Sequence, residues 1–269
     1  MIRKILVAYI CSLYVDEEIF FKFIKNYKKY SPGVKHKLLI CFKNLSNDKI
    51  KYFKSRLVNL NYIAFQDLRH RNDWDFMSFY RIAKKYDDYL ILFLSNQAYP
   101  IKKNWLLLMY SNYKNKRILG ATGSYESISS RGFLRNYNEN IFYYIFRIIK
   151  YLINFPLFPN PHIRTTGFMM FAKDYLLYEF EKKYFTKFHN WKTESGRNSM
   201  TNFFKKKGFE ILIVNSDGKV FLENDWKSSQ TYCYKNQNKL IISDKRTRKY
   251  DKFSLKEKKI KEKIVWGLN

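Results

Sequence analysis

Short apolar runs alternate with amphipathic helical patterns over the first third of the chain. Residues 4–9, 37–42 and 61–65 have the apolar composition of buried strands, and residues 16–30 and 48–58 place apolar side chains at helical spacing. A helix between two strands carries the chain back across the sheet, so successive strands run parallel. The order strand, helix, strand, helix, strand therefore predicts an α/β fold with a mainly parallel sheet.

A second, stronger strand pattern ends in a polar stretch. Residues 89–94 read Tyr-Leu-Ile-Leu-Phe-Leu and are followed directly by Ser95, Asn96 and Gln97. Helical patterns flank this strand at 76–86 and 105–113. Open α/β sheets bind ligands outside the carboxyl ends of their strands, so we expect Ser95 and Asn96 to face a ligand.

The second half of the chain contains one unusually apolar segment. Residues 141–153 are apolar nearly all round and about as long as a short helix, but Arg147 and Lys150 interrupt the run too much for it to cross a membrane. Two readings remain open: a buried core helix, or a helix that lies in the headgroup region of a membrane. The pattern further predicts strands at 117–122, 163–171 and 210–214, and helices at 174–184 and 195–207.

Composition limits the possible functions. The chain has 269 residues and 51 Lys and Arg against 23 Asp and Glu, a net charge of +28. The three cysteines lack metal-ligand spacing, which indicates a reducing compartment, and the apolar N-terminus lacks a cleavage site, which indicates a strand and not a leader peptide. The lysines are scattered, which favours an anionic membrane surface, or AT-rich coding alone, over nucleic acid. No G-x-G-x-x-G or G-x-x-x-x-G-K-[ST] motif is present, which argues against Rossmann dinucleotide enzymes and P-loop ATPases.

Two segments carry a resemblance to a known group. Asn72-Asp73-Trp74-Asp75-Phe76-Met77-Ser78-Phe79-Tyr80 and Ser95-Asn96-Gln97-Ala98-Tyr99-Pro100 together resemble the central part of bacterial GT-A-type glycosyltransferases of cell-surface polysaccharide assembly, the rhamnan synthesis F-like, O-antigen and capsule group. The resemblance implies a mixed, mainly parallel central sheet flanked by helices, with a C-terminal appendage over the active site. It also implies that Asp73 and Asp75 contact a nucleotide-sugar donor, together with Ser95 and Asn96.

A third segment resembles the Glu-Ser-Gly motif of the same enzymes. It runs from Trp191 to Thr201 and contains Glu194-Ser195-Gly196-Arg197. The resemblance implies that Glu194 is the base of an inverting transfer, taking the proton of the acceptor hydroxyl, and that Arg197 binds the donor diphosphate. The alternative is that Thr193 or Ser195 caps a helix, with Glu194 as an acid of its first turn.

Two further segments complete the resemblance. Pro161 to Met169 resembles the acceptor side of the cleft, where His162 and Arg164 would bind acceptor or phosphate; a structural histidine is the alternative. Residues 225–267 would fold over or beside the active site, or else form a structural cap or a basic tail. We expect one domain over 1–269, with a donor half at 1–122, an acceptor and catalytic half at 123–222, and the appendage at 223–269.

The resemblance departs from the group at the end of the strong strand. Metal-dependent members carry Asp-x-Asp there, because two carboxylates hold the Mg²⁺ or Mn²⁺ that neutralises the diphosphate, whereas this chain has Ser95-Asn96-Gln97. Metal dependence is therefore doubtful, and Arg197 or Arg164 would have to supply the positive charge. The sequence predicts a cytoplasmic, peripherally membrane-associated glycosyltransferase acting on a lipid-linked glycan. A non-catalytic basic protein that binds nucleic acid or membranes, and a glycosyltransferase that has lost transfer, are the alternatives.

Overall fold

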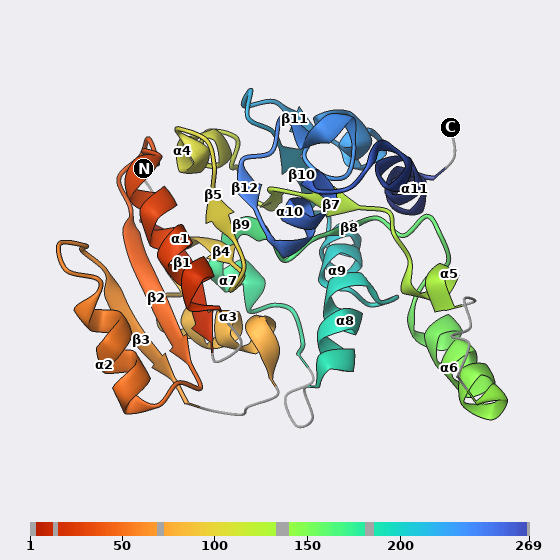
Figure 1. The fold of residues 1–269 in the computed structure, drawn as a ribbon, viewed down its shortest axis with the longest axis horizontal. Helices are drawn as coiled ribbons and strands as arrows, with labels where there is room; N and C mark the ends of the chain where they lie inside the picture. Colours follow the sequence, from red (N-terminus) through yellow and green to blue (C-terminus); the bar gives the residue numbers. More distant parts are fainter. Residues whose placement is uncertain (1–3, 13–15, 69–72, 133–139, 181–185, 268–269) are drawn as a thin grey trace.

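The computed structural model describes residues 4–12, 16–68, 73–132, 140–180 and 186–267, and one large sheet runs through it (Figure 1). The sheet has eight strands in the order β11-β10-β6-β9-β4-β1-β2-β3. Strands β1 to β4 run parallel, as do β6 and β10, whereas β9 is antiparallel to both of its neighbours and β11 to β10. The expected mixed, mainly parallel sheet is confirmed. The strands are β1 (Ile5–Ser12), β2 (Lys37–Lys43), β3 (Ile63–Asp67), β4 (Leu90–Leu94), β6 (Arg117–Gly120), β9 (Gly167–Phe171), β10 (Glu210–Val214) and β11 (Val220–Phe221).

Helices cover both faces of this sheet because the central strands are apolar on both sides. On one face Val7 and Tyr9 of β1 pack with Phe23, and the rings of Tyr9 and Phe23 stack at 3.8 Å. On the other face Leu6 and Ala8 pack with the opposite group of helices. The first group is α1 (Glu17–Lys29), α2 (Asn47–Ser55) and α4 (Trp105–Tyr110), and the second includes α3 (Trp74–Lys85), α7 (Ala172–Tyr175) and α9 (Met200–Lys206).

The C-terminal segment folds back onto the middle of the chain. Strand β12 (Ile242–Ser243) pairs antiparallel with β5 (Tyr99–Pro100), just beyond the end of β4. This ladder places α10 (Lys245–Asp251) beside the polar end of β4, and α11 (Leu255–Trp266) follows, with the indole of Trp266 donating to the carbonyl of Tyr232. The remaining short elements are β7 (Gly123–Ser124), α5 (Ile128–Gly132), β8 (His162–Ile163), η1 (Glu223–Ser229) and η2 (Lys235–Gln237).

The helix expected at 195–207 is two helices in the structure. Helix α8 (Lys187–Ser195) ends at a tight turn in which a side chain on Gly196 would meet the carbonyl oxygen of Lys192 at 2.6 Å. Helix α9 then begins at Met200, capped by the hydroxyl of Ser199. Glu194 therefore lies in the last turn of α8, and the alternative that placed it in the first turn of a helix is wrong.

Two other expected elements also differ. The strand expected at 163–171 is divided into β8 and β9, with Arg164, Thr165 and Thr166 between them. The helix expected at 174–184 is reduced to α7, and residues 181–185 lie outside the described residues. The division at 164–166 matters for function because it turns these side chains out of the sheet.

The apolar segment at 141–153 forms helix α6 (Ile141–Asn154), which extends away from the body at the lower right of Figure 1. None of its residues is buried. The expectation of a buried core helix is therefore wrong. Among the helices in the described part of the chain, none is long and apolar enough to traverse a lipid bilayer.

Candidate active site

The polar stretch after β4 is held in a tight turn by the core of the sheet. The amide of Asn96 donates to the hydroxyl of Ser12 at the end of β1, and the hydroxyl of Tyr9 donates to the carbonyl of Asn96, both at 3.0 Å. The N–H of Ala98 closes the turn on the carbonyl of Ser95. The ends of the two adjacent parallel strands β1 and β4 are thereby joined.

Asp75 meets this turn from the first turn of α3. Its carboxylate accepts the backbone N–H of Asn96. Burial raises the pKa of Asp75 to about 6, although Lys43 and the Asn96 N–H act in the opposite direction, and the nearby carboxylates of Glu194 and Asp73 raise it further. The structure thus brings Asp75, Asn96 and Glu194 into one electrostatic neighbourhood.

Asp73 lies beside this neighbourhood in a buried ionic cluster. Its carboxylate pairs with Lys43 of β2 and, at 2.6 Å, with the guanidinium of Arg81. The same Arg81 pairs at 2.6 Å with Asp67, at the end of β3, and the hydroxyl of Ser78 also donates to Asp67. Although burial acts to raise it, the pKa of Asp67 is lowered because Arg81, Ser78 and Lys43 stabilise its charge. These contacts fix α3 across the ends of β2 and β3 and so position Asp75.

Glu194 is oriented by the chain between β8 and β9. Its Oε1 accepts the backbone N–H of Thr165 at 3.0 Å and the Thr165 hydroxyl at 3.1 Å. Both bonds go to the same oxygen, so Oε2 is the oxygen that can accept a proton from a ligand. A half-buried carboxylate with one oxygen fixed has the arrangement that a general base needs.

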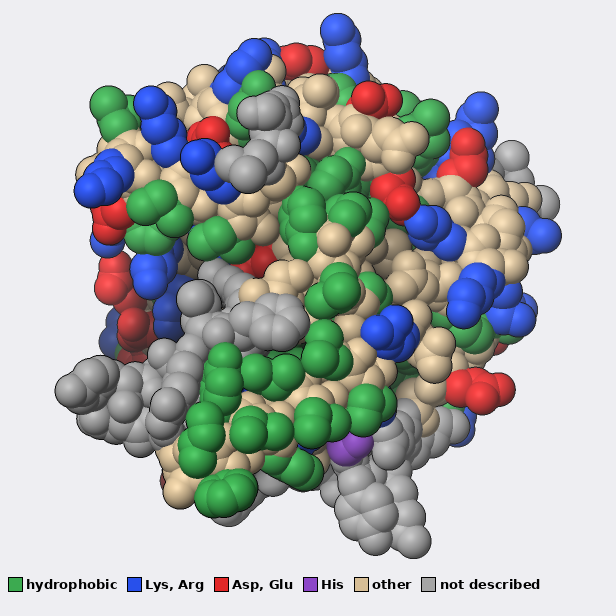
Figure 2. All heavy atoms as spheres, turned by 90° about the vertical axis from the view of Figure 1, so that its right-hand side faces the viewer, with side chains coloured by type: hydrophobic (Ala, Val, Ile, Leu, Met, Phe, Trp, Pro, Cys, Tyr) green, Lys and Arg blue, Asp and Glu red, His purple; other side chains and the backbone are tan. Residues whose placement is uncertain are grey.

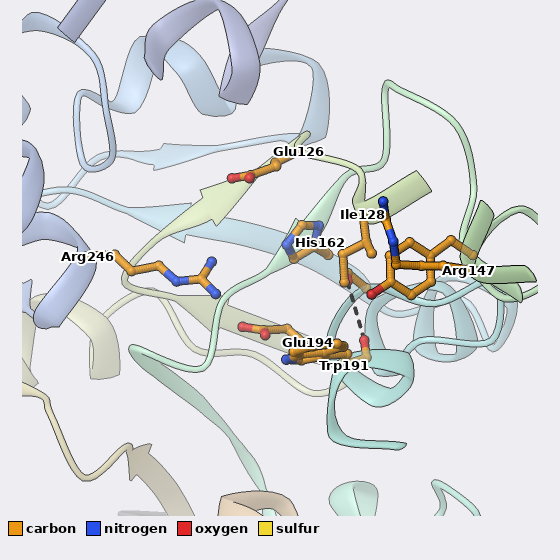
Figure 3. Close-up of a pocket in the computed structure, with 9 residues that line it drawn as sticks. Glu126, Ile128, Arg147, His162, Trp191, Glu194 and Arg246 are labelled. Atoms are coloured by element: carbon orange, nitrogen blue, oxygen red, sulfur yellow. Dashed lines mark hydrogen bonds between the residues drawn. The ribbon is translucent and has the colours of Figure 1, made fainter. Parts of the chain in front are cut away.

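Glu194 lines a pocket of about 270 Å³ (Figure 3). The buried ring of His162 lies in its wall, with Nδ1 bonded to the carbonyl of Asn160 at 2.8 Å, which leaves Nε2 as the acceptor nitrogen of the neutral ring. Burial lowers the pKa of His162, so the ring is neutral at pH 7. Arg246 reaches into the pocket on the side of Glu194. The residues that line the pocket are Glu126, Ile128, Arg147, Tyr151, His162, Trp191, Glu194, Ser195 and Arg246.

Arg164 lies behind the pocket wall and not in it. Its guanidinium pairs with Asp244 at 2.9 Å and stacks 3.9 Å from the centre of the Tyr232 ring. Although burial acts to raise it, the pKa of Asp244 is lowered because Arg164 and the Thr166 hydroxyl stabilise the charged form. This buried pair ties the β8–β9 connection to α10, and therefore sets the position of Thr165 relative to Arg246.

Arg197 lies apart from the Glu194 pocket. Its guanidinium donates to the carbonyls of Ile153, at 3.0 Å, and Leu152, at 2.8 Å, at the C-terminal end of α6. It lines a different pocket, on the other side of α8. The structure brings Glu194 and His162 together, with Asp75 and Asn96 nearby, but gives Arg197 the role of anchoring α6.

Sequence reasoning missed the contribution of three residues. Thr165 orients Glu194, Arg246 enters the pocket, and Arg248 donates to the backbone carbonyl of Gln97 at 3.0 Å and to its side-chain oxygen at 3.2 Å. The available signal for both arginines was the basic run Lys245-Arg246-Thr247-Arg248, in a segment expected beside the active site.

Several solved glycosyltransferases have similar but distant structures. GalNAc-T7 with UDP, GalNAc and Mn²⁺ has a TM-score of 0.44 and 8% identity, over 79% of this chain and 42% of that chain. The galactosyltransferase LgtC with donor and acceptor sugar analogues has a TM-score of 0.43 and 8% identity, over 78% and 73%. The mannosyltransferase Ktr4p from S. cerevisiae with GDP has a TM-score of 0.36 and 12% identity, over 70% and 60%. No family model and no curated protein matches the chain.

Proposed function

We propose that this protein is a glycosyltransferase that moves a sugar from a nucleotide-sugar donor to a glycan acceptor with inversion at the anomeric carbon. The observation that carries the proposal is the Glu194 carboxylate, fixed by Thr165 at the wall of a pocket. The same carboxylate is close enough to Asp75, beside the polar end of β4, to raise the pKa of Asp75. That end of the sheet is where α/β folds bind ligands.

The proposed transfer needs one base and no covalent intermediate. The acceptor hydroxyl attacks the anomeric carbon while the bond from that carbon to the diphosphate oxygen breaks on the opposite side. The hydroxyl proton passes to Oε2 of Glu194, and the nucleoside diphosphate leaves with the bonding electron pair. Neutral His162, with its acceptor nitrogen Nε2, would receive a hydrogen bond from a second acceptor hydroxyl and so orient the sugar.

The donor would occupy the ends of β1, β2 and β4. Ser95 and Asn96 would face its sugar and phosphates, and Asp75, at the start of α3, would bind a ribose or sugar hydroxyl. Asp73 would act on the donor through its ion pairs with Lys43 and Arg81, which hold α3 in place.

The residues at the end of β4 do not fit a Mg²⁺ or Mn²⁺ ion. A divalent cation prefers carboxylate oxygens, but residues 95–97 offer one hydroxyl and two amides, and the Gln97 oxygen already accepts the Arg248 guanidinium. Within the described part of the chain, the carboxylate of Asp75 meets this turn. We therefore assign neutralisation of the departing diphosphate to Arg248 and Arg246, since guanidinium groups bind phosphate oxygens through paired donors.

The setting of the reaction is part of the proposal. The net charge of +28 supports association with an anionic membrane surface, and we place the enzyme at the inner face of the cell membrane with a lipid-linked surface glycan as acceptor. Rhamnan, O-antigen and capsule assembly are the pathways that the sequence resemblance suggests.

A thermal-shift screen of the full chain against UDP-, GDP-, dTDP- and CMP-sugars tests the donor assignment. A ligand that binds only the folded protein raises its melting temperature by mass action, so we expect stabilisation by one nucleotide family, with and without Mn²⁺. If none of the nucleotide sugars raises the melting temperature but heparin or anionic vesicles do, the result would instead support a non-catalytic basic binding protein. Donor binding without any transfer or hydrolysis would indicate a glycosyltransferase that has lost transfer.

A further inference from the structure

Helix α6 exposes a continuous apolar face. The side chain of Phe142 is 79% exposed, that of Phe146 63% and that of Ile153 66%. The exposed apolar positions 141, 142, 145, 146, 149 and 153 recur at helical spacing and lie on one side of the helix. Figure 2 looks onto this side of the molecule and shows a band of hydrophobic side chains in its lower half.

The C-terminal end of α6 is fastened to the body of the protein. The Ser129 hydroxyl donates to the carbonyls of Tyr151 and Phe155, and Arg197 donates to those of Leu152 and Ile153. The side chain of Asn140 caps the other end through the N–H of Phe142. The helix is therefore held in place at its C-terminal end and capped at its N-terminal end, and its apolar face points outward.

The charges around this face are positive. Lys150 lies on α6 and is exposed, whereas Arg147 lines the Glu194 pocket, and the sequence has no acidic residue from Asn140 to Lys173. A second copy of the chain packed on the same face around a two-fold axis would bring the two Lys150 side chains toward one another, and residues 140–173 contain no acidic residue to pair with them. An anionic lipid surface offers the complementary charge and accepts the apolar side chains.

We propose that α6 is a membrane-interface helix that lies in the plane of an anionic bilayer. Its 14 residues span about 21 Å at 1.5 Å per residue, too little to cross the hydrocarbon core but sufficient to lie along the headgroups. The apolar face enters the boundary of the acyl chains, while Lys150 meets the phosphates.

The same helix borders the candidate active site. Arg147 and Tyr151 of α6 line the pocket that Glu194 also lines, so the pocket borders the helix that carries the proposed membrane contact (Figure 3). The next step rests on the proposed glycosyltransferase function. With that function, the acceptor is an amphiphile whose lipid stays in the bilayer while its sugar reaches Glu194. Arg147 then stands where the phosphate between lipid and sugar would pass.

Vesicle co-sedimentation of the full chain tests the membrane contact. The probes are vesicles of phosphatidylcholine alone and of phosphatidylcholine with about a third phosphatidylglycerol. We expect the protein to bind the anionic vesicles in a salt-dependent way and Phe142→Ser/Phe146→Ser to reduce the partition coefficient at least tenfold. The matched control is Leu255→Ser/Leu222→Ser, which removes two equally exposed apolar side chains, 79% and 60%, from outside α6 and should bind like wild type.

The vesicle and donor-binding measurements test the membrane contact and the transferase function separately. Equal binding by the α6 variant and wild type, or no binding to either vesicle, would overturn the proposal. So would a wild-type dimer in sedimentation that the α6 substitutions convert to a monomer. Donor-induced thermal stabilisation should be the same in wild type and the α6 variant; its absence in both would overturn the transferase and leave the vesicle result standing on its own.

Discussion

Glu194 accepts both the backbone N–H and the hydroxyl of Thr165 on a single oxygen, at 3.0 and 3.1 Å. The first bond comes from the backbone of Thr165 and the second from its side chain, so a substitution of Thr165 can remove the second bond alone. Glu194→Gln should lower kcat by about 10² or more, because the base is lost, while donor binding persists. Thr165→Val should lower kcat less, since the backbone bond still orients the carboxylate. Product formation with the donor identified by thermal shift measures both effects, and full turnover by Glu194→Gln would rule this base out.

Asp75 should make the protein less stable as pH rises. The pKa of Asp75 is raised to about 6 in the folded state from an ordinary value of 3.8, so the folded protein keeps this proton through a range in which the unfolded chain loses it. The contribution of Asp75 to the free energy of unfolding should therefore fall as pH rises from about 4 to about 6, and its full cost should remain above that range.

Replacement of Asp75 by Asn should remove this dependence. We expect Asp75→Asn to raise the free energy of unfolding at pH 7.5 by on the order of 2 to 3 kcal/mol and to weaken donor binding. Urea denaturation at pH 4.5 and 7.5 measures the difference, with the exposed Asp48→Asn as control. A variant as pH-dependent as wild type would contradict the assignment.

The buried cluster around Lys43 should be important for stability. The side chain of Lys43 is 5% exposed and pairs with Asp67 and Asp73, so Lys43→Met leaves two buried carboxylates with only the Arg81 guanidinium as a cation. We expect a loss of about 3 kcal/mol in the free energy of unfolding. Lys4→Met, which breaks the exposed pair with Asp88, should leave the urea midpoint unchanged. Equal effects of the two substitutions would show that the cluster is not desolvated.

Donor binding should survive chelation of metals and depend on Arg248. Its guanidinium stays at the end of β4 without a metal, so EDTA should leave the donor dissociation constant unchanged. Arg248→Gln should raise that constant about tenfold or more, as expected for loss of a charge-assisted phosphate contact. Calorimetric titration with and without EDTA provides the measurement. Loss of binding in EDTA would return a divalent metal to the site.

Substitution of Arg197 distinguishes a role in anchoring α6 from a role in binding the donor diphosphate. If its main contacts are the α6 carbonyls, Arg197→Ala should speed amide hydrogen exchange in the last turn of α6 several-fold and leave donor affinity unchanged. A donor affinity lowered tenfold with unchanged exchange would instead support the diphosphate role expected from the sequence.

Local sequence patterns predicted most of the strands, although the strand expected at 163–171 is divided in two. The apolar run before Ser95 is β4, and the expected ligand-facing residues lie at its end, because strand burial and the following turn are both local properties. The helix break after Glu194 was missed. It depends on the close approach of Gly196 to Lys192, which helical periodicity does not report.

A local sequence pattern could not predict the contribution of the C-terminal segment to the candidate site. Arg248 contacts Gln97 across 151 residues of sequence, through the pairing of β5 with β12. The exposure of α6 could not be predicted either, since an apolar helix that packs in a core and one that lies exposed at the surface can have the same composition. Only the exposed side chains of the folded protein distinguish the two.

The pairing of β5 with β12 also sets the order in which the site can be completed during synthesis. The segments that contain Asn96 and Thr165, the partner of Glu194, leave the ribosome long before α10, which contains Arg246 and Arg248. A nascent chain would therefore contain Glu194 and the turn after β4 before it contains Arg246 and Arg248, the two arginines that we propose for the diphosphate. Premature termination after β11 would yield a protein able to form most of its sheet and unable to complete its cleft.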